Sequence, residues 1–376
     1  MKNHGWATAS EFLGDRIVYR NLVPLDARLP GLAEIAPSLG LPPGRTPRKH
    51  ELDYARVVAR LLEEARALDQ PGQPIRRLVF VGDTELLDGS AFANLCRVTG
   101  WPGLAFIGDE TDEPAAYRLG EAGAGRLYLA NRWAALEAFD MFCEQAGQPV
   151  GEGSGVVIDL DKTILGARRR NSKVIDWARS RAMEATITEV LGESFEAQAF
   201  GEVYRLFNQV EFHPFTSDNQ DYLAYVCLMT LAGAAEAAQL AEAVRRGELE
   251  SFEQFIEQVD RGQDKLPVPV RDVHREVVGC VWAGDPTPFK AFRRREYEVT
   301  VSKMGCLEGD APVEALLERE ITLTEEVRQM ALEWQRRGAL IFGLSDKPDE
   351  ASLPTREQAE RGCQPLHRTR THAVGA

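Results

Sequence analysis

The sequence has 376 residues, of which 44% are hydrophobic and 27% are charged, the usage of a globular protein rather than a disordered or fibrous one. Asp and Glu (58) outnumber Lys and Arg (44) and give a formal net charge of −14, which disfavours binding to nucleic acid or to an anionic membrane. The length predicts two domains, and six scattered cysteines without a C-x-x-C pair favour reduced thiols in a cytoplasmic protein.

The first half of the chain alternates helical and strand patterns. Residues 1–46 are rich in Pro and Gly, contain no apolar segment of the signal-peptide kind, and are predicted to form an irregular N-terminal arm. Apolar side chains at helical spacing then predict helices over 51–68 and 134–142. Between and after them lie four short apolar runs, 77–82, 104–107, 127–129 and 156–158. This alternation predicts an α/β fold with a doubly wound, mostly parallel, Rossmann-like sheet.

A large helical insert is predicted over residues 168–320. Helical periodicity dominates there, as in 221–240 and 252–259, and only 297–301 suggests a strand. The longest mainly apolar stretch is shorter than the ~20 residues that a bilayer requires, so we expect no membrane-spanning segment. The buried-strand pattern returns at 339–344. The sequence therefore predicts an α/β core made of 47–167 and 321–376, interrupted by the insert.

Acidic or hydroxyl side chains directly follow three of the predicted strands. Because the carboxyl ends of parallel strands meet at one edge of a sheet, where α/β proteins bind their ligands, we expect these side chains to lie together. Carboxylates in such a place can bind a hard cation and act as nucleophile or acid–base group. The alternative is that each one only caps the helix that follows it. The residues are Asp83 and Asp88, Asp159 and Asp161, and Ser345.

These residues resemble the motifs of the haloacid dehalogenase superfamily of phosphohydrolases. The first motif of the family, a strand followed by D-x-D-x-T, matches Asp159, Asp161 and Thr163. The second, a strand followed by Ser or Thr, matches Ser345, and the fourth, G-D-x-x-x-x-D, matches Gly82, Asp83 and Asp88. A second Gly-Asp pair, Gly108-Asp109 with Asp112, is a rival for the fourth motif, but its spacing is shorter.

The third motif of the family is a lone lysine before the helix that leads into the fourth-motif strand. Lys49 has that position, while Lys347, beside Ser345, and Arg48 remain alternatives. The third and fourth motifs precede the first here, so the resemblance implies a circularly permuted core. It covers about 47–167 and 321–376, and the insert lies between the first and second motifs, where many members of the family carry a helical cap domain.

The resemblance implies a Mg²⁺-dependent phosphatase that acts on a small phosphorylated substrate. Asp159 would be the nucleophile and Asp161 the acid–base group, and Mg²⁺ would be held by Asp159, Asp161 and Asp83 with the support of Asp88. The resemblance further implies phosphate contacts from Ser345 and Lys49, and we expect substrate contacts from Thr163, Arg168 and Lys347. A phosphomutase or phosphotransferase would share these motifs, and a non-catalytic phosphate-binding or metabolite-binding scaffold is the alternative from another class.

Two basic clusters are candidates for attracting an anionic substrate to this acidic protein. The first, Arg168–Arg170, follows the first motif, and the second consists of Lys290 with Arg293–Arg295. The alternative for both is a solvated surface whose arginines pair with neighbouring glutamates.

Overall fold

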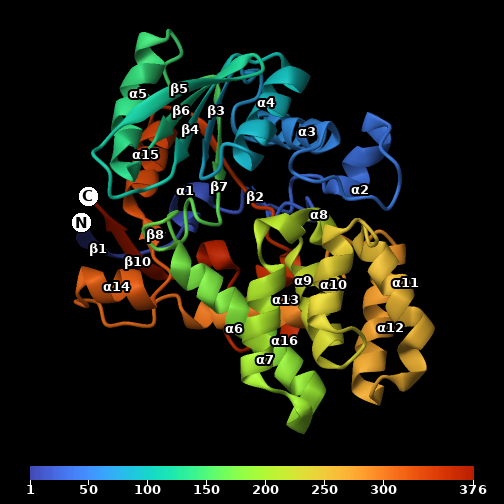
Figure 1. The fold of residues 1–376 in the computed structure, drawn as a ribbon. Helices are drawn as coiled ribbons and strands as arrows, with labels where there is room; N and C mark the ends of the chain where they lie inside the picture. Colours follow the sequence, from blue (N-terminus) through green and yellow to red (C-terminus); the bar gives the residue numbers. More distant parts are fainter. The chain divides into compact units, whose positions relative to one another are not determined.

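Seven strands form the main sheet of the protein, in the order β2-β9-β7-β3-β4-β6-β5 (Figure 1). The computed structural model describes residues 1–376. Neighbouring strands run parallel throughout this sheet, except that β5 is antiparallel to β6. The prediction of a mostly parallel α/β sheet is confirmed. The strands are β2 (Ile17–Val18), β3 (Arg77–Gly82), β4 (Gly103–Gly108), β5 (Tyr117–Ala122), β6 (Gly125–Ala130), β7 (Ser154–Asp159) and β9 (Leu340–Leu344).

Helices cover both faces of this sheet, which is why its central strands are continuous apolar runs. All six residues of β7 are buried. Figure 1 shows one pair of helices on one side of the sheet and a second pair on the other. Apolar side chains of the first pair share one core with side chains from β3, β7 and β9. The first pair is α3 (Leu52–Asp69) and α4 (Leu87–Thr99), and the second is α5 (Leu136–Gln145) and α15 (Glu325–Arg336).

A three-stranded sheet joins the two ends of the chain. Strand β10 (Thr371–Gly375) pairs antiparallel with β1 (Lys2–Ala7) and parallel with β8 (Leu323–Thr324). Lys2 lies opposite Gly375, so the termini are side by side (Figure 1).

The prediction of an irregular arm over residues 1–46 is wrong. This segment supplies β1, the edge strand β2, α1 (Ser10–Leu13) and α2 (Leu32–Ile35). These elements have only two to six residues, and only one residue of β1 is buried. Neither helical nor strand periodicity can be recognised over such short segments.

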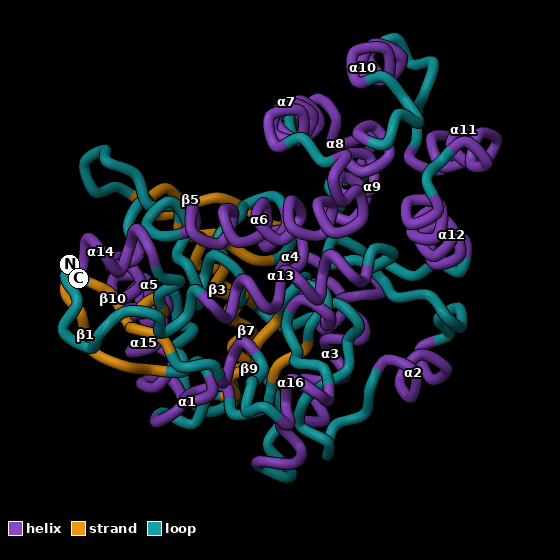
Figure 2. The backbone as a smooth tube through the Cα atoms, turned by 90° about the horizontal axis from the view of Figure 1, so that it is seen from below, coloured by secondary structure: helices purple, strands orange, loops and turns teal.

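The chain divides into two compact units, residues 1–177 with 300–376, and residues 178–299. In Figure 2 the strands are confined to the first unit, and the second consists of helices and loops. The helical unit is shorter than the predicted insert of 168–320, because residues 168–177 and 300–320, including α14 (Val313–Arg319), belong to the first unit. None of the helices combines the length and the apolar character needed to cross a bilayer.

The helical unit has an apolar core of its own, to which α9 contributes seven consecutive buried residues, 223–229. The strand suggested at 297–301 is wrong, because these residues belong to α13. The helix predicted over 221–240 is interrupted near Gly233, whose φ is +79°. The helices are α6 (Ser172–Leu191), α7 (Ala197–Phe207), α8 (His213–Thr216), α9 (Gln220–Leu231), α10 (Ala237–Arg245), α11 (Phe252–Gly262), α12 (Val268–Trp282) and α13 (Lys290–Ser302).

Candidate functional site

Three strands that end in motif residues are adjacent in the main sheet. Strand β7 lies between β9 and β3, and its last residue, Asp159, pairs with Leu344 of β9. On its other side Ile158 pairs with Val81 of β3. Because these parallel strands end almost level, Ser345, Asp159 and Asp83 leave the sheet at the same edge.

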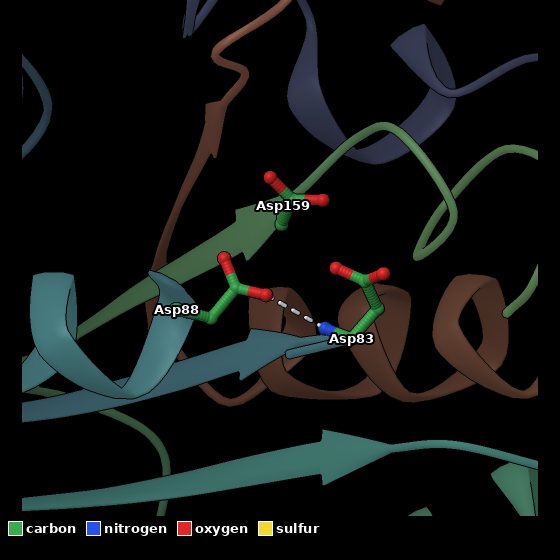
Figure 3. Close-up of side chains that lie close together, drawn as sticks. All are labelled: Asp83, Asp88 and Asp159. Atoms are coloured by element: carbon green, nitrogen blue, oxygen red, sulfur yellow. Dashed lines mark hydrogen bonds between the residues drawn. The ribbon is translucent and has the colours of Figure 1, made fainter. Parts of the chain in front are cut away.

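Three carboxylates meet at this edge and form the aspartate cluster (Asp83, Asp88 and Asp159; Figure 3). Each of them has a carboxylate oxygen within 4.8 Å of the others. They come from the loop after β3, the first turn of α4 and the end of β7. All three are buried, with exposed fractions of 9%, 1% and 4% respectively, so they do not form an ordinary solvated acidic surface.

The turn after β3 explains the spacing from Gly82 to Asp88. The Asp88 carboxylate folds back over the end of β3 and accepts hydrogen bonds from the backbone N–H groups of Asp83 (2.8 Å) and Thr84 (2.9 Å). A Cβ atom at Gly82 would lie 2.5 Å from Cγ of Asp88. Glycine is therefore required at position 82 for the Asp88 side chain to take this place.

Lys49 contacts two carboxylates of the aspartate cluster. Its Nζ lies 2.6 Å from Oδ1 of Asp159 and 2.6 Å from Oδ1 of Asp88, and its exposed fraction is 5%. The two alternatives contact other carboxylates: Lys347 Nζ lies 3.8 Å from Oδ1 of Asp161, and Arg48 lies 3.8 Å from Asp346.

The remaining motif residues surround the cluster without joining it. Asp161 is half-buried, and its side chain lies outside the group of three converging carboxylates. Ser345 is fully buried, and its Oγ accepts a hydrogen bond of 3.2 Å from the backbone N–H of Lys347. The hydroxyl of Thr163 is buried without a hydrogen-bond partner, whereas its carbonyl accepts a hydrogen bond from the Thr324 hydroxyl.

Arg168 reaches the aspartate cluster from the loop after β7. Its Nη1 lies 2.8 Å from Oδ2 of Asp83, and its Nε lies 3.4 Å from Oδ1 of Asp109. Its neighbour Arg169 also contacts Asp109, at 3.0 Å. The guanidinium of Arg168 thus contacts two carboxylates, those of Asp83 and Asp109.

One further arginine in each of the two basic clusters is bound by two acidic residues. Arg170 is bound by Glu110 and Glu326. In the helical unit, Arg293 is buried and bound by Asp221 and Glu296. These two arginines therefore pair with acidic residues, as the alternative expected, but their side chains are only 3% exposed and do not form the solvated surface that it assumed.

The rival Gly-Asp pair has a packing explanation. A Cβ atom at Gly108 would lie 2.9 Å from the ring of Trp133, so this glycine is required by the aromatic side chain beside it. Asp109 follows β4, which is separated from β7 by β3, and Asp112 is exposed. The rival pair therefore does not contribute to the aspartate cluster.

Tyr54 is a further polar group beside the cluster that the sequence did not indicate. It lies in the first turn of α3, is 1% exposed, and its hydroxyl has no hydrogen-bond partner. Burial raises the pKa of this phenol, and the charge of Lys49 acts in the opposite direction. Its spacing fits the apolar face of an amphipathic helix, so no signal distinguished it from a core residue.

The electrostatics of the cluster favour a bound cation. Burial raises the pKa of Asp83 to about 7, and the neighbouring charge of Asp88 adds to the effect. Burial also raises the pKa of Asp159 well above its usual value, although Lys49 opposes it. Lys49 stays charged, because Asp159 and Asp88 more than offset the effect of its burial and raise its pKa. A cation at the cluster would keep the carboxylates ionised.

The donor set fits Mg²⁺ in kind and in spacing. Mg²⁺ prefers oxygen ligands at about 2.0–2.1 Å, so two of its ligands lie about 3 to 4 Å apart. The oxygens of the cluster lie within 4.8 Å of one another, so only a small rotation of the side chains is needed to bring them to this spacing. Both oxygens of Asp88 already accept hydrogen bonds, one from Lys49 and the other from backbone N–H groups. Asp83 and Asp159 are therefore the better ligands, with Asp88 orienting them.

The raised pKa of Asp83 predicts that the cation-free protein loses stability as the pH rises. A carboxyl whose pKa is about 7 in the folded protein and near 3.8 when unfolded binds its proton more tightly in the folded state. The free energy of unfolding should therefore fall between about pH 4 and about pH 7, by a few kcal/mol at most. Urea denaturation in the presence of EDTA measures this fall.

Asp83→Asn is the control for this pH dependence. The variant cannot titrate at position 83, so its free energy of unfolding should fall less over the same pH range than that of the unaltered protein. Equal slopes for the two proteins would show that Asp83 titrates normally in the folded state.

A separate pocket of about 640 Å³ lies in the first unit, at the opposite end of the strands. It is lined by the start of β9, at Ala339 and Ile341, and by the end of α3, including Arg66. Other charged side chains in its wall pair with one another, as Arg28 does with Asp26. None of the predicted site residues lines this pocket.

Comparisons with known proteins found no relative. No family model matches the chain, and neither the curated proteins nor the solved structures include a significant match.

Proposed function

We propose that the protein is a Mg²⁺-dependent phosphatase of the haloacid dehalogenase type, which hydrolyses a small phosphate ester through an aspartyl phosphate. The observation that carries the proposal is the contact between Lys49 and Asp159, whose Nζ and Oδ1 atoms lie 2.6 Å apart. A lysine 110 positions away from the first-motif aspartate reaches it together with Asp83 and Asp88. If each aspartate only capped the helix that follows it, Lys49 and the three carboxylates would not need to meet at one place.

The order of the strands supports the permuted arrangement of the motifs. The candidate first-motif strand, β7, lies between the candidate second-motif strand, β9, and the candidate fourth-motif strand, β3. The ends of the chain pair with each other through β1 and β10, and circular permutation is tolerated where the ends of a domain are adjacent. The helical unit, which lies between Thr163 and Ser345 in the sequence, remains the candidate cap domain.

In the proposed first step, a carboxylate oxygen of Asp159 attacks the phosphorus atom of the ester. The new bond joins Asp159 to phosphorus, the bond from phosphorus to the ester oxygen breaks, and Asp161 gives its proton to the departing oxygen. Lys49 and the Ser345 hydroxyl would stabilise the phosphoryl oxygens as negative charge develops on them. Asp161 is assigned the proton transfer because it lies two positions after Asp159 and is half-buried.

In the second step, water attacks the phosphorus atom of the aspartyl phosphate. Asp161 accepts a proton from this water, the bond between Asp159 and phosphorus breaks, and inorganic phosphate leaves. Mg²⁺, held by Asp83 and Asp159, would offset the repulsion between an anionic nucleophile and an anionic substrate. Asp88 would keep Asp83 and Lys49 in place through its hydrogen bonds.

A hydrolysis assay tests the proposal directly. The purified full-length protein should release phosphate from p-nitrophenyl phosphate or from a member of a panel of sugar, nucleotide and organic-acid phosphates. Hydrolysis should require Mg²⁺, because without it three buried carboxylates face the substrate phosphate. EDTA should abolish it and added Mg²⁺ should restore it.

The same assay separates the alternatives. Transfer of the phosphoryl group to another substrate hydroxyl, with little release of phosphate, would indicate a phosphomutase or a phosphotransferase. No turnover of any ester, together with measurable binding of phosphate, would favour a non-catalytic scaffold.

A further inference from the structure

The side chain of Arg168 binds one oxygen of Asp83, a carboxylate that would hold the proposed cation. Its Nη1 lies 2.8 Å from Oδ2 of Asp83, and its Nε lies 3.4 Å from Oδ1 of Asp109. Asp83 is 9% exposed, whereas the Arg168 side chain is 34% exposed. The guanidinium therefore bridges a buried carboxylate of the cluster and a more exposed carboxylate outside it.

The backbone at Arg168 is held in place on both sides. Its N–H donates to the carbonyl of Lys162 over 2.8 Å, and Lys162 has a φ of +67° in the tight turn after β7. On the other side, the Arg170 side chain is 3% exposed and is bound by Glu110 and Glu326. Movement at this position is thus confined to the long, partly exposed side chain of Arg168.

We propose, on the basis of the proposed function, that Arg168 competes with the divalent cation for Asp83 and passes to Asp109 when the cation binds. A guanidinium and a divalent cation repel each other and cannot share one carboxylate oxygen. A cation that takes Oδ2 of Asp83 must therefore break the contact with Arg168, and a cation held by Oδ1 would still be repelled by the guanidinium 2.8 Å from Oδ2. Asp109 already lies 3.4 Å from Nε, so the displaced guanidinium keeps an anionic partner.

This competition sets the affinity of the site for its cation. The contact with Arg168 stabilises Asp83 in the cation-free protein, and that stabilisation is lost when the cation enters. Removing the guanidinium removes the competitor and should strengthen cation binding. Removing Asp109 should weaken it, because the displaced guanidinium then has no anionic partner close by.

Arg168→Met and Arg169→Met form the matched pair that tests the competition. Both substitutions remove one positive charge beside Asp109, but only Arg168 contacts Asp83. Free Mn²⁺, a spectroscopic substitute for Mg²⁺, is measured by electron paramagnetic resonance while the full-length protein is titrated. We expect about tenfold tighter binding in Arg168→Met, equivalent to about 1.4 kcal/mol, and a change of at most about twofold in Arg169→Met. Equal effects of the two substitutions would overturn the proposal.

A double variant separates competition from general electrostatics. Asp109→Asn should weaken Mn²⁺ binding in the unaltered protein but should have little effect in the Arg168→Met background, because Asp109 acts through Arg168. If the two effects are independent and simply add, the proposal fails.

The outcome is distinguishable from that of the proposed function. If Mn²⁺ binding follows this pattern but the protein hydrolyses no phosphate ester, the proposed phosphatase activity is wrong and the competition between Arg168 and the cation is supported. If the protein hydrolyses a phosphate ester but Arg168→Met leaves the Mn²⁺ affinity unchanged, the phosphatase activity is supported and the competition is wrong. Absence of Mn²⁺ binding in both the unaltered protein and Arg168→Met would overturn both.

Discussion

Asp159→Asn is expected to abolish phosphate-ester hydrolysis, with a loss of at least about 10³-fold in kcat. An amide cannot form the aspartyl phosphate, and the neighbouring carboxylates Asp83 and Asp88 are held by Arg168 and Lys49. The substitution should leave thermal stability almost unchanged. Lys49 keeps its contact with Asp88, and the variant has one buried negative charge fewer. Steady-state hydrolysis of p-nitrophenyl phosphate and the thermal unfolding midpoint measure the two effects.

Asp161→Asn is the control for the identity of the nucleophile. If Asp161 only transfers protons, its loss should lower kcat/KM, which reports the first step, less for an aryl phosphate, whose phenolate leaves without help, than for an alkyl phosphate, whose alkoxide needs a proton. Asp159→Asn should lose activity on both substrates to the same extent. Hydrolysis retained in Asp159→Asn, or a loss in Asp161→Asn that is equal for both leaving groups, would contradict the proposed roles.

The core of the fold was predictable because helices cover both faces of the main sheet. Strands β3, β7 and β9 are buried along almost their whole length, so each is a continuous apolar run between turn residues. The parts that were missed have no such pattern. Strand β2 has two residues, and β1 is held by pairing with β10, at the far end of the sequence. Sequence periodicity reports burial within one segment and contains no information about such distant partners.

The aspartate cluster was predictable for a different reason. Parallel strands end at one edge of a sheet, so residues that directly follow β3 and β7 had to come close together once the strands were adjacent. The direction of each side chain was not predictable. Asp161 is only two positions after Asp159, yet it lies outside the cluster, because the chain has already entered a turn. The contact of Arg168 with Asp83 likewise depends on the path of that turn.

Lys49→Met is expected to cause the largest loss of stability, about 3–5 kcal/mol at neutral pH in the absence of divalent cations. Methionine fills much of the same space, so the loss is mainly electrostatic. It leaves Asp88 and Asp159, which are 1% and 4% exposed, without the ammonium group that lies 2.6 Å from each. Urea denaturation in EDTA measures the difference in the free energy of unfolding from the unaltered protein.

Two further measurements link that loss to the unpaired carboxylates. Without Lys49 the pKa values of Asp88 and Asp159 rise in the folded protein, so the variant binds protons more tightly when folded and its stability falls as the pH rises. Its deficit should therefore be smaller at about pH 5 than at about pH 8. Adding Asp159→Asn to Lys49→Met should recover part of the stability, because it removes one of the unpaired charges. A deficit that does not depend on pH and that Asp159→Asn does not reduce would mean that Lys49 contributes by packing, and that the cluster does not depend on its charge.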